Sequence, residues 1–256
     1  MADSPLKVWL DRDGALLRLR LNRPKANIVD AAMIAALAAA FAEYRDPGAI
    51  RAALLDAEGP HFSFGASVEE HLPERCAAML GGLHSLLITM LEWPRPVLAA
   101  VRGQCLGGGV ELTLATSLIF AAPEAQFGQP EIKLAVFAPA ASCLLPFRLS
   151  QSAAEDLLFS GRSVSGAEAK ALGLVDFVAD DPEAAALGYF DAHLAGKSAA
   201  SLGFAVRAAR EGMLAEARRR LAAVEKLYLE GTMASHDAIE GLQAFLAKRQ
   251  PAWKHH

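Results

Sequence analysis

Residues 97–116 read VLAAVRGQCLGGGVELTLAT. The five apolar residues 97–101 predict a short buried strand, the glycine-rich residues 103–109 predict a turn, and residues 110–116 predict a helix. A strand that leads directly into a helix is the unit from which sheets of parallel strands are built. If similar units flank this stretch, the chain has an α/β fold.

The amino-terminal sequence supplies such units. Alternating apolar and charged residues around Asp13-Gly14 predict a hairpin with strands over residues 8–10 and 16–21. Asp30 is positioned to cap a helix over residues 31–44, and residues 52–56 predict another buried strand. A helix over residues 80–91 and a strand over residues 118–122 continue the alternation, which predicts a mostly parallel sheet.

After residue 150 the pattern predicts helices only. The expected segments cover residues 153–159, 166–172, 182–195 and 201–248. We therefore expect two regions, an α/β core over residues 1–195 and a helical C-terminal region over residues 196–256.

Composition narrows the class of protein. The 256 residues are 53% hydrophobic and 21% charged, and a chain of this length buries about 70% of its surface on folding, which excludes intrinsic disorder as the main state. The net charge of −4 gives no general electrostatic reason to bind nucleic acid. Arginines near the C-terminus alternate with glutamates, which favours a solvated helix face over an RNA-binding patch. These arginines are Arg207, Arg210, Arg218, Arg219 and Arg220.

The three cysteines, Cys76, Cys105 and Cys143, have neither CxxC nor Cys/His metal-ligand spacing. We expect reduced, buried thiols, no metal site and a cytoplasmic protein. Residues 1–7 contain no apolar signal core, and the longest uncharged stretches, such as residues 134–147, are too short to span a bilayer. We therefore expect no membrane contact.

The glycine turn is a candidate anion site. Three consecutive glycines let the backbone approach a ligand closely and leave N–H donors at a helix N-terminus. A phosphate would fit, and so would an oxyanion that forms during a reaction. The turn contains neither GxxxxGK[ST] nor GxGxxG, and a tight turn without a ligand is the alternative.

Two glutamates near this turn favour a catalytic site over a turn without a ligand. Glu111 falls in the first turn of the predicted helix, and Glu131 follows in the sequence FGQPEI at residues 127–132. A carboxylate among apolar residues has to be paired, solvated or functional, although Glu111 could serve only the helix dipole. Two carboxylates beside one oxyanion turn could divide general-acid and general-base work.

These two motifs, GGGVE at residues 107–111 and FGQPE at residues 127–131, resemble the signature of the enoyl-CoA hydratase/isomerase (crotonase) family. Further motifs match the family in order, and the resemblance covers essentially the whole chain. They are LRLNRP at residues 19–24, HFSFGA at 61–66, PVLAAVRG at 96–103, SGR at 160–162, Ala167 with Ala169, and GLV at 173–175.

The resemblance implies a spiral of repeated ββα units followed by C-terminal helices that assemble homotrimers or dimers of trimers. It implies an acyl-CoA thioester substrate whose carbonyl lies between the N–H groups of Ala66 and Gly108. Glu111 and Glu131 match the acid/base pair of the family's hydratases. Residues expected to contact the coenzyme A part are Lys25, Ala26, Phe64 and Ser67. Coenzyme A is part of the substrate, so the resemblance implies no separate cofactor.

The chain departs from the family pattern in two places. Ser67 stands where aspartate is common, and after Glu131 the usual leucine-glycine and Pro-x-Gly-Gly are replaced by LAVFAPAASC at residues 134–143. The loss of glycines stiffens this loop and Phe137 adds bulk, which indicates either drift in a packing loop or an acyl pocket shaped for a rigid ring.

The altered segment, together with residues 25–33 and 59–68, is similar to the family's hydratases that act on cyclohexa-1,5-diene-1-carbonyl-CoA in anaerobic benzoyl-CoA degradation. That resemblance implies 1,4-addition of water to give 6-hydroxycyclohex-1-ene-1-carbonyl-CoA. Glu111 would activate water and Glu131 would deliver a proton, in an order that the sequence leaves open. The alternatives are hydration of a straight-chain 2-enoyl-CoA, enoyl-CoA isomerisation, and a non-catalytic binding protein, which the paired glutamates disfavour.

Overall fold

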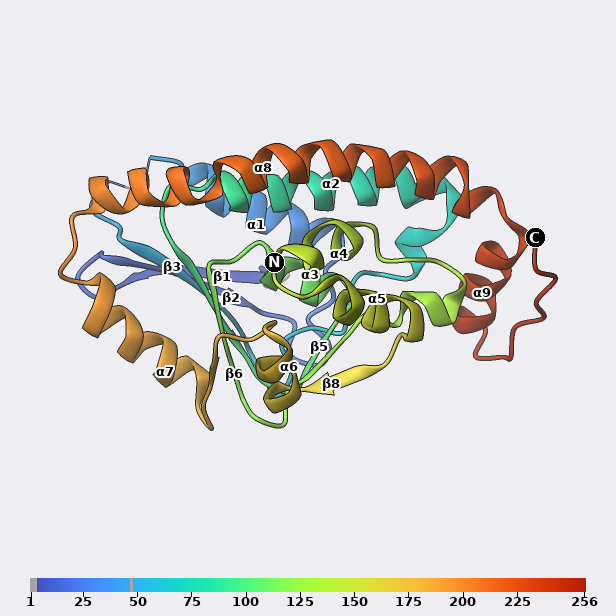
Figure 1. Cartoon of the computed structure of the whole chain (residues 1–256), viewed down its shortest axis with the longest axis horizontal. Coiled ribbons are helices and arrows are strands. Elements are labelled where there is room, and N and C mark those ends of the chain that lie inside the picture. The colour runs from blue at the N-terminus through green and yellow to red at the C-terminus, as the bar shows by residue number, and fades with distance from the viewer. Residues whose placement is uncertain (1–3, 47) are drawn as a thin grey trace.

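The computed structural model describes residues 4–46 and 48–256, so residues 1–3 and 47 of the predicted core lie outside the described residues. A six-stranded sheet lies at the centre, in the order β1-β2-β3-β4-β6-β9 (Figure 1). All neighbours pair in parallel except the β1–β2 hairpin. The strands are β1 Leu6–Asp11, β2 Leu16–Leu21, β3 Ala52–Ala57, β4 Val97–Val101, β6 Leu118–Ala121 and β9 Phe177–Val178.

A second sheet of three strands adjoins the first, in the order β5-β7-β8. β5 (Gln104–Leu106) lies within the predicted glycine turn and pairs in parallel with β7 (Gln126–Gly128). β8 (Ser163–Ser165) forms the other edge of this sheet and pairs antiparallel with β7. The prediction of helices only after residue 150 is therefore wrong. β8 and β9 have three and two residues, which is too short to show a periodicity of two in the sequence.

The predicted helices form where expected, with shifted ends. Asp30 caps α1 (Ala31–Glu43) because its carboxylate accepts a hydrogen bond from the Met33 N–H at 2.9 Å. α2 runs over Pro73–Glu92 and begins well before residue 80, since Pro73 fits the first helical position. The remaining helices of the core are α3 Gly108–Leu114, α4 Pro139–Leu144, α5 Gln151–Ser160, α6 Gly166–Leu172 and α7 Pro182–Tyr189.

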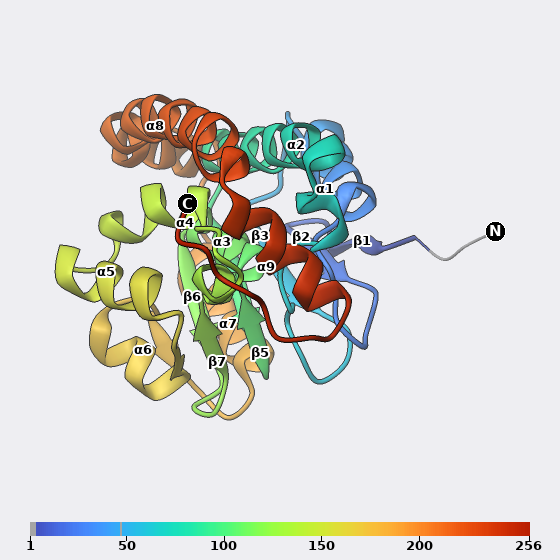
Figure 2. The same cartoon turned by 90° about the vertical axis from the view of Figure 1, so that its right-hand side faces the viewer.

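The C-terminal region is a long helix followed by a short one. α8 (Ala199–Glu230) lies along α2 and contacts α4, and α9 (His236–Leu246) folds back across one end of the molecule (Figures 1 and 2). The predicted helix over residues 201–248 is broken at Gly231, after which Ser235 caps α9. Ala217 and Leu221 of α8 belong to the same buried cluster as the sheet, so the division near residue 195 stays a prediction.

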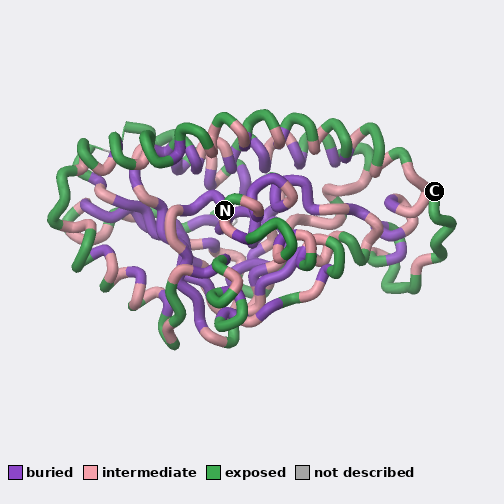
Figure 3. Tube along the Cα trace, in the orientation of Figure 1, coloured by how far each residue is buried: buried purple, intermediate pink, exposed green. Residues whose placement is uncertain are grey.

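Burial follows this layering. Buried residues concentrate in the strands and on the inward faces of the helices, whereas the outer face of α8 is exposed (Figure 3). Within residues 4–46 and 48–256, every helix is too short or too polar to cross a lipid bilayer.

Candidate active site

The predicted oxyanion donors, the N–H groups of Ala66 and Gly108, come from two segments that lie against each other. A Cβ on Gly108 would lie 3.2 Å from the Ala66 nitrogen, and one on Gly65 would lie 3.0 Å from the Leu106 carbonyl oxygen. Gly65 has φ +99°, a backbone conformation that L side chains rarely adopt. Neither the Ala66 nor the Gly108 N–H donates to an acceptor among the described residues. Both amides are therefore free to bind one oxygen of a ligand.

The Ala66 side of this pair is held by hydrogen bonds to the segment before α1. The Ser63 hydroxyl donates to the Asn27 carbonyl oxygen at 2.7 Å and accepts from the Gly65 N–H at 3.0 Å. The Val29 N–H donates to the Gly65 carbonyl oxygen at 2.9 Å. These contacts fix the direction of the Ala66 N–H before any ligand binds, as an oxyanion donor requires.

Glu131 reaches the same place from the second sheet. Pairing of β5 with β7 sets Leu106 opposite Gly128, and the Gly107 N–H donates to the Gly128 carbonyl oxygen at 2.9 Å. Glu131 follows in the 3-10 turn η2 (Pro130–Leu134), and a Cβ on Gly107 would collide with its Oε1. With its amide nitrogen toward Glu131, Gln129 donates to both carboxylate oxygens, at 3.2 and 3.0 Å.

Glu111 is held by the segment that departs from the family pattern. Glu111 is 4% exposed, and its Oε1 accepts a hydrogen bond from the Ala141 N–H at 2.8 Å. Ala141 is the third residue of α4, and Pro139 occupies the first position of that helix. Residues 134–143 are thus not only a loop, because α4 begins within them and turns its amino-terminal N–H groups toward Glu111.

The two carboxyl groups share one electrostatic environment. Burial raises the pKa of Glu111 to about 7, against the opposing effect of the hydrogen bonds from Ala141 and Ala140. Burial and the charge of Glu111 raise the pKa of Glu131 to about 8. At neutral pH the pair can therefore hold one proton, with Glu111 ionised and Glu131 protonated. One carboxylate base and one carboxylic acid are thus available in the same electrostatic environment.

A cavity of about 350 Å³ leads from the surface to Glu131. Predicted residues Phe64 and Ala66 line it, whereas Lys25, Ala26 and Ser67 line an open groove of about 650 Å³. The cavity is otherwise lined by Gly65, Val68, His71, Gly107, Pro130, Lys133, Leu134, Val136, Leu242 and Phe245. The last two belong to α9, which therefore forms part of the cavity wall.

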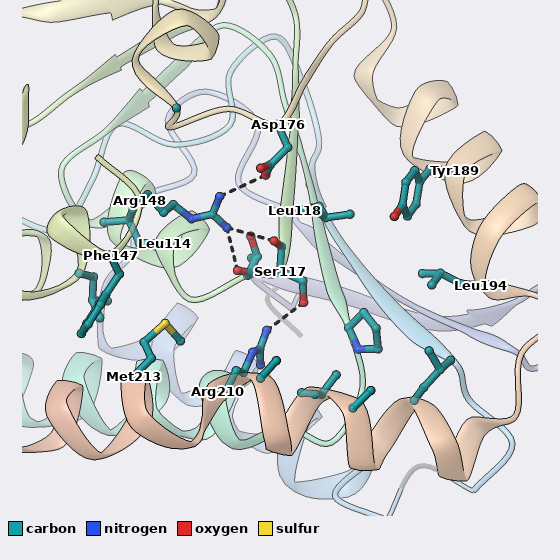
Figure 4. Close-up of a pocket in the computed structure, with 18 residues that line it drawn as sticks. Leu114, Ser117, Leu118, Phe147, Arg148, Asp176, Tyr189, Leu194, Arg210 and Met213 are labelled. Carbon is teal, nitrogen blue, oxygen red and sulfur yellow. Dashed lines mark hydrogen bonds and ion pairs between the residues drawn. The ribbon is translucent and has the colours of Figure 1, made fainter. Parts of the chain in front are cut away.

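A larger cavity of about 630 Å³ lies between α7 and α8 (Figure 4). Arg148 pairs with Asp176 at 3.1 Å and also donates to carbonyl oxygens that follow α3. Arg210 donates to the Ser117 hydroxyl at 2.9 Å and to carbonyl oxygens at the end of α2. The expectation that Arg210 lies on a solvated face is wrong, since it is 9% exposed. Because these arginines are engaged and no carboxyl pair is present, we place the candidate active site at the smaller cavity.

The three cysteines were expected to be reduced and buried. Cys76, Cys105 and Cys143 are buried free thiols, as expected. In the described part of the chain, no group of three or more His, Cys, Asp and Glu side chains is arranged to hold a metal ion.

Comparison with known proteins identifies the fold and the family. A family model described as enoyl-CoA hydratase/isomerase matches residues 11–256. The chain belongs to the enoyl-CoA hydratase/isomerase family. A solved enoyl-CoA hydratase/isomerase from Pseudoalteromonas atlantica T6c is similar with a TM-score of 0.85 and 28% identity, covering 97% of this chain and 99% of the other. The family and fold predictions are confirmed.

Two curated relatives in this family are close in length to the chain. Cyclohexa-1,5-dienecarbonyl-CoA hydratase of Thauera aromatica is 64% identical over 253 residues, covering 99% of this chain and 98% of that protein. Carnitinyl-CoA dehydratase of Salmonella enteritidis PT4 is 33% identical over 255 residues, covering 96% and 97%.

The departure from the family pattern has a local cost in backbone strain. Ala135, at the position where the family has glycine, adopts φ +56° in the left-handed region. Phe137 does not line the cavity in the described structure. Its ring packs on Tyr228 of α8 with ring centroids 5.2 Å apart. The predicted substrate residue thus lies one layer behind the cavity wall.

Three polar side chains at the site were missed from the sequence. His71 lines the cavity, and its Nδ1 lies 2.7 Å from the Ser67 carbonyl oxygen. Gln129 stands inside the FGQPE motif and contacts Glu131. Tyr228 is fully buried, close enough to Glu111 and Glu131 for their charges to raise its pKa. Only Gln129 gave a signal, its place in the motif.

Proposed function

We propose that this enzyme is a hydratase (a hydro-lyase) that adds water to cyclohexa-1,5-diene-1-carbonyl-CoA and forms 6-hydroxycyclohex-1-ene-1-carbonyl-CoA. The observation that carries the proposal is a pair of carboxyl groups, buried Glu111 and half-buried Glu131 at the cavity, together with two free backbone amides. The chain is also 64% identical to a relative named for this activity. The proposal assigns the enzyme to the degradation of aromatic compounds through benzoyl-CoA.

In the proposed first step, the thioester carbonyl oxygen accepts hydrogen bonds from the Ala66 and Gly108 N–H groups. Glu111, as a carboxylate, takes a proton from water while the water oxygen forms a bond to ring carbon 2. The electron pair of the C1=C2 bond moves through carbon 1 onto the carbonyl oxygen and gives a dienolate. Each amide donor of this kind typically contributes about 3 kcal/mol to stabilising the transition state.

In the second step, protonated Glu131 delivers its proton to ring carbon 5. The electron pair of the C5=C6 bond forms the new C5–H bond, and the pair held by the dienolate forms the C1=C6 double bond as the carbonyl is restored. Proton exchange between the carboxyls and solvent returns Glu111 to its ionised form. Water has then added in a 1,4 sense, and substrate carbon 2 is carbon 6 of the product.

This chemistry needs an electron sink, and the thioester carbonyl provides it. The proposed reaction therefore requires no redox cofactor or metal ion, and coenzyme A enters as part of the substrate. We assign the coenzyme A part to the groove at Lys25, Ala26 and Ser67, with Phe64 between that groove and the cavity. The ammonium group of Lys25 suits the phosphates of coenzyme A.

We also propose that the chain forms homotrimers, or dimers of trimers, through its helical layer. Exposed aromatic and aliphatic side chains support this assembly, since monomers seldom leave them in water without a reason. Phe159 on α5 is 69% exposed, and Phe204 and Leu227 on α8 are 65% and 59% exposed. Light scattering on the purified protein tests the proposal, and a monomer at assay concentration would refute it.

The test of the activity compares two substrates on purified protein without added metal or nucleotide. We expect turnover of cyclohexa-1,5-diene-1-carbonyl-CoA to exceed that of crotonyl-CoA strongly, with gain of one water and retention of one conjugated double bond. Preference for crotonyl-CoA would instead support the straight-chain alternative. Glu131→Gln should lower kcat by about 10²–10⁴-fold. Glu124→Gln makes the same change at an exposed position between β6 and β7 and should leave kcat unaltered.

A further inference from the structure

Tyr228 occupies an unusual position for a residue of the long C-terminal helix. It lies near the end of α8 and is fully buried, although most of that helix faces solvent on one side. Its apolar surroundings include residues of α2, of α9 and of the segment before α4. The residues of this cluster include Cys76, Met79, Leu80, Val136, Phe137 and Leu242.

The hydroxyl group of Tyr228 has no hydrogen-bond partner among the described residues. Native proteins contain few buried polar atoms of this kind, because such a group has lost its bonds to water and gained none in return. The ring itself is well packed, with Phe137 at 5.2 Å. Packing therefore explains the aromatic ring and leaves the hydroxyl unexplained, since phenylalanine would fill the same volume.

Tyr228 packs against the wall of the candidate active site. Val136 and Leu242 both line the cavity and belong to the Tyr228 cluster, so Tyr228 lies directly behind that wall. Burial raises the pKa of the phenol, and the charges of Cys76, Glu131 and Glu111 raise it further. In the proposed reaction, the acyl ring extends from the amide donors to the two glutamates, whose charges act on this hydroxyl.

We propose that the Tyr228 hydroxyl hydrogen-bonds the oxygen atom that is added to the ring, holding the attacking water before the reaction and the product hydroxyl after it. This inference rests on the proposed function. A phenol can donate to an oxygen and accept from it, so it can serve water and product in turn. The reacting water must lie within hydrogen-bond distance of a glutamate, and the charges of both glutamates act on the phenol.

A hydrogen bond from Tyr228 to the added oxygen should affect only ligands that carry a hydroxyl on the ring, whereas a packing role should affect ligands with and without it. Tyr228→Phe should weaken binding of 6-hydroxycyclohex-1-ene-1-carbonyl-CoA about fivefold to tenfold, the effect of one lost neutral hydrogen bond. Binding of cyclohex-1-ene-1-carbonyl-CoA, which lacks only the hydroxyl, should change less than about twofold. For the diene, kcat should fall while KM stays near the wild-type value.

The experiment measures both dissociation constants by calorimetry for wild type, Tyr228→Phe and Tyr189→Phe. Tyr189 is the matched control, because it is a tyrosine of α7 that faces the other cavity. Equal weakening of the two ligands would assign Tyr228 to packing and overturn the proposal. A fall in kcat without selective loss of the hydroxylated ligand would also overturn it, because the phenol would then act only on a glutamate.

Failure of the proposed function is visible separately. If the wild-type protein does not hydrate the diene, the activity is wrong whatever Tyr228 does. If the wild-type protein hydrates the diene and the Tyr228→Phe variant binds both ligands as wild type does, only the role of Tyr228 is refuted.

Discussion

Replacement of Glu111 by glutamine should make the protein more stable at alkaline pH while it inactivates the enzyme. The folded protein holds the Glu111 proton more tightly than the unfolded chain, since burial raises the pKa from 4.5 to about 7. Each rise in pH across that window therefore lowers the free energy of unfolding, by at most about 1.4 kcal/mol per unit, and the penalty reaches about 3 kcal/mol above pH 7. Glutamine carries no charge and can still accept the Ala141 N–H.

Guanidinium unfolding at pH 5 and pH 8.5 measures this effect. At pH 5 the Glu111→Gln variant and wild type should agree within about 1 kcal/mol, and at pH 8.5 the variant should be more stable by about 3 kcal/mol with an unchanged denaturant slope. The exposed control Glu124→Gln should show no such difference. A variant that is less stable than wild type at pH 8.5 would show that ionised Glu111 does not destabilise the folded protein, which contradicts a raised pKa.

Three further outcomes follow from the geometry. kcat/KM should be bell-shaped in pH with limbs near the pKa values of Glu111 (about 7) and Glu131 (about 8), because the base must be ionised and the acid protonated; a flat profile from pH 6 to 9 would contradict this. Gly107→Ala should lower the free energy of unfolding by about 1–3 kcal/mol and remove most activity, because φ is +50° and the added Cβ would collide with Glu131. Gly188→Ala, on α7 with open space around it, is the control and should change neither the melting temperature nor the kinetics. Ala135→Gly should change the unfolding free energy by less than about 1 kcal/mol, since relief of left-handed strain offsets the added chain entropy; a larger loss in a denaturant titration would argue against that strain.

The parts of the fold that the sequence predicts are those with long or distinctive patterns. Three local patterns predict the observed structure because tertiary contacts agree with them. They are the alternation around Asp13-Gly14, the cap at Asp30 and the apolar run of β4. β8 and β9 form because β7 and β6 already offer an edge, and such short pairings leave no pattern of their own.

At the site, the glycine turn and the two glutamates were predictable from the residues themselves, whereas the pair of Ala66 and Gly108 amides came from the family resemblance. Glu111 and Glu131 stand out as charges in apolar stretches, and Gly107 as part of a glycine run. The N–H that donates to Glu111 belongs to the backbone of Ala141, and every residue type except proline carries such a group, so the sequence does not indicate it. Tyr228 lies behind the cavity wall only because α8 returns over the core, so its role depends on contacts between residues far apart in the sequence.

The central claim is 1,4-addition of water by the Glu111–Glu131 pair, and hydration of cyclohexa-1,5-diene-1-carbonyl-CoA in D₂O tests it directly. The product, 6-hydroxycyclohex-1-ene-1-carbonyl-CoA, should carry one carbon-bound deuterium at ring carbon 3, which is carbon 5 of the substrate. NMR of the product locates the label. Deuterium at product carbon 5 would mean 1,2-addition across the second double bond, and it would contradict the dienolate route through the Ala66 and Gly108 amides.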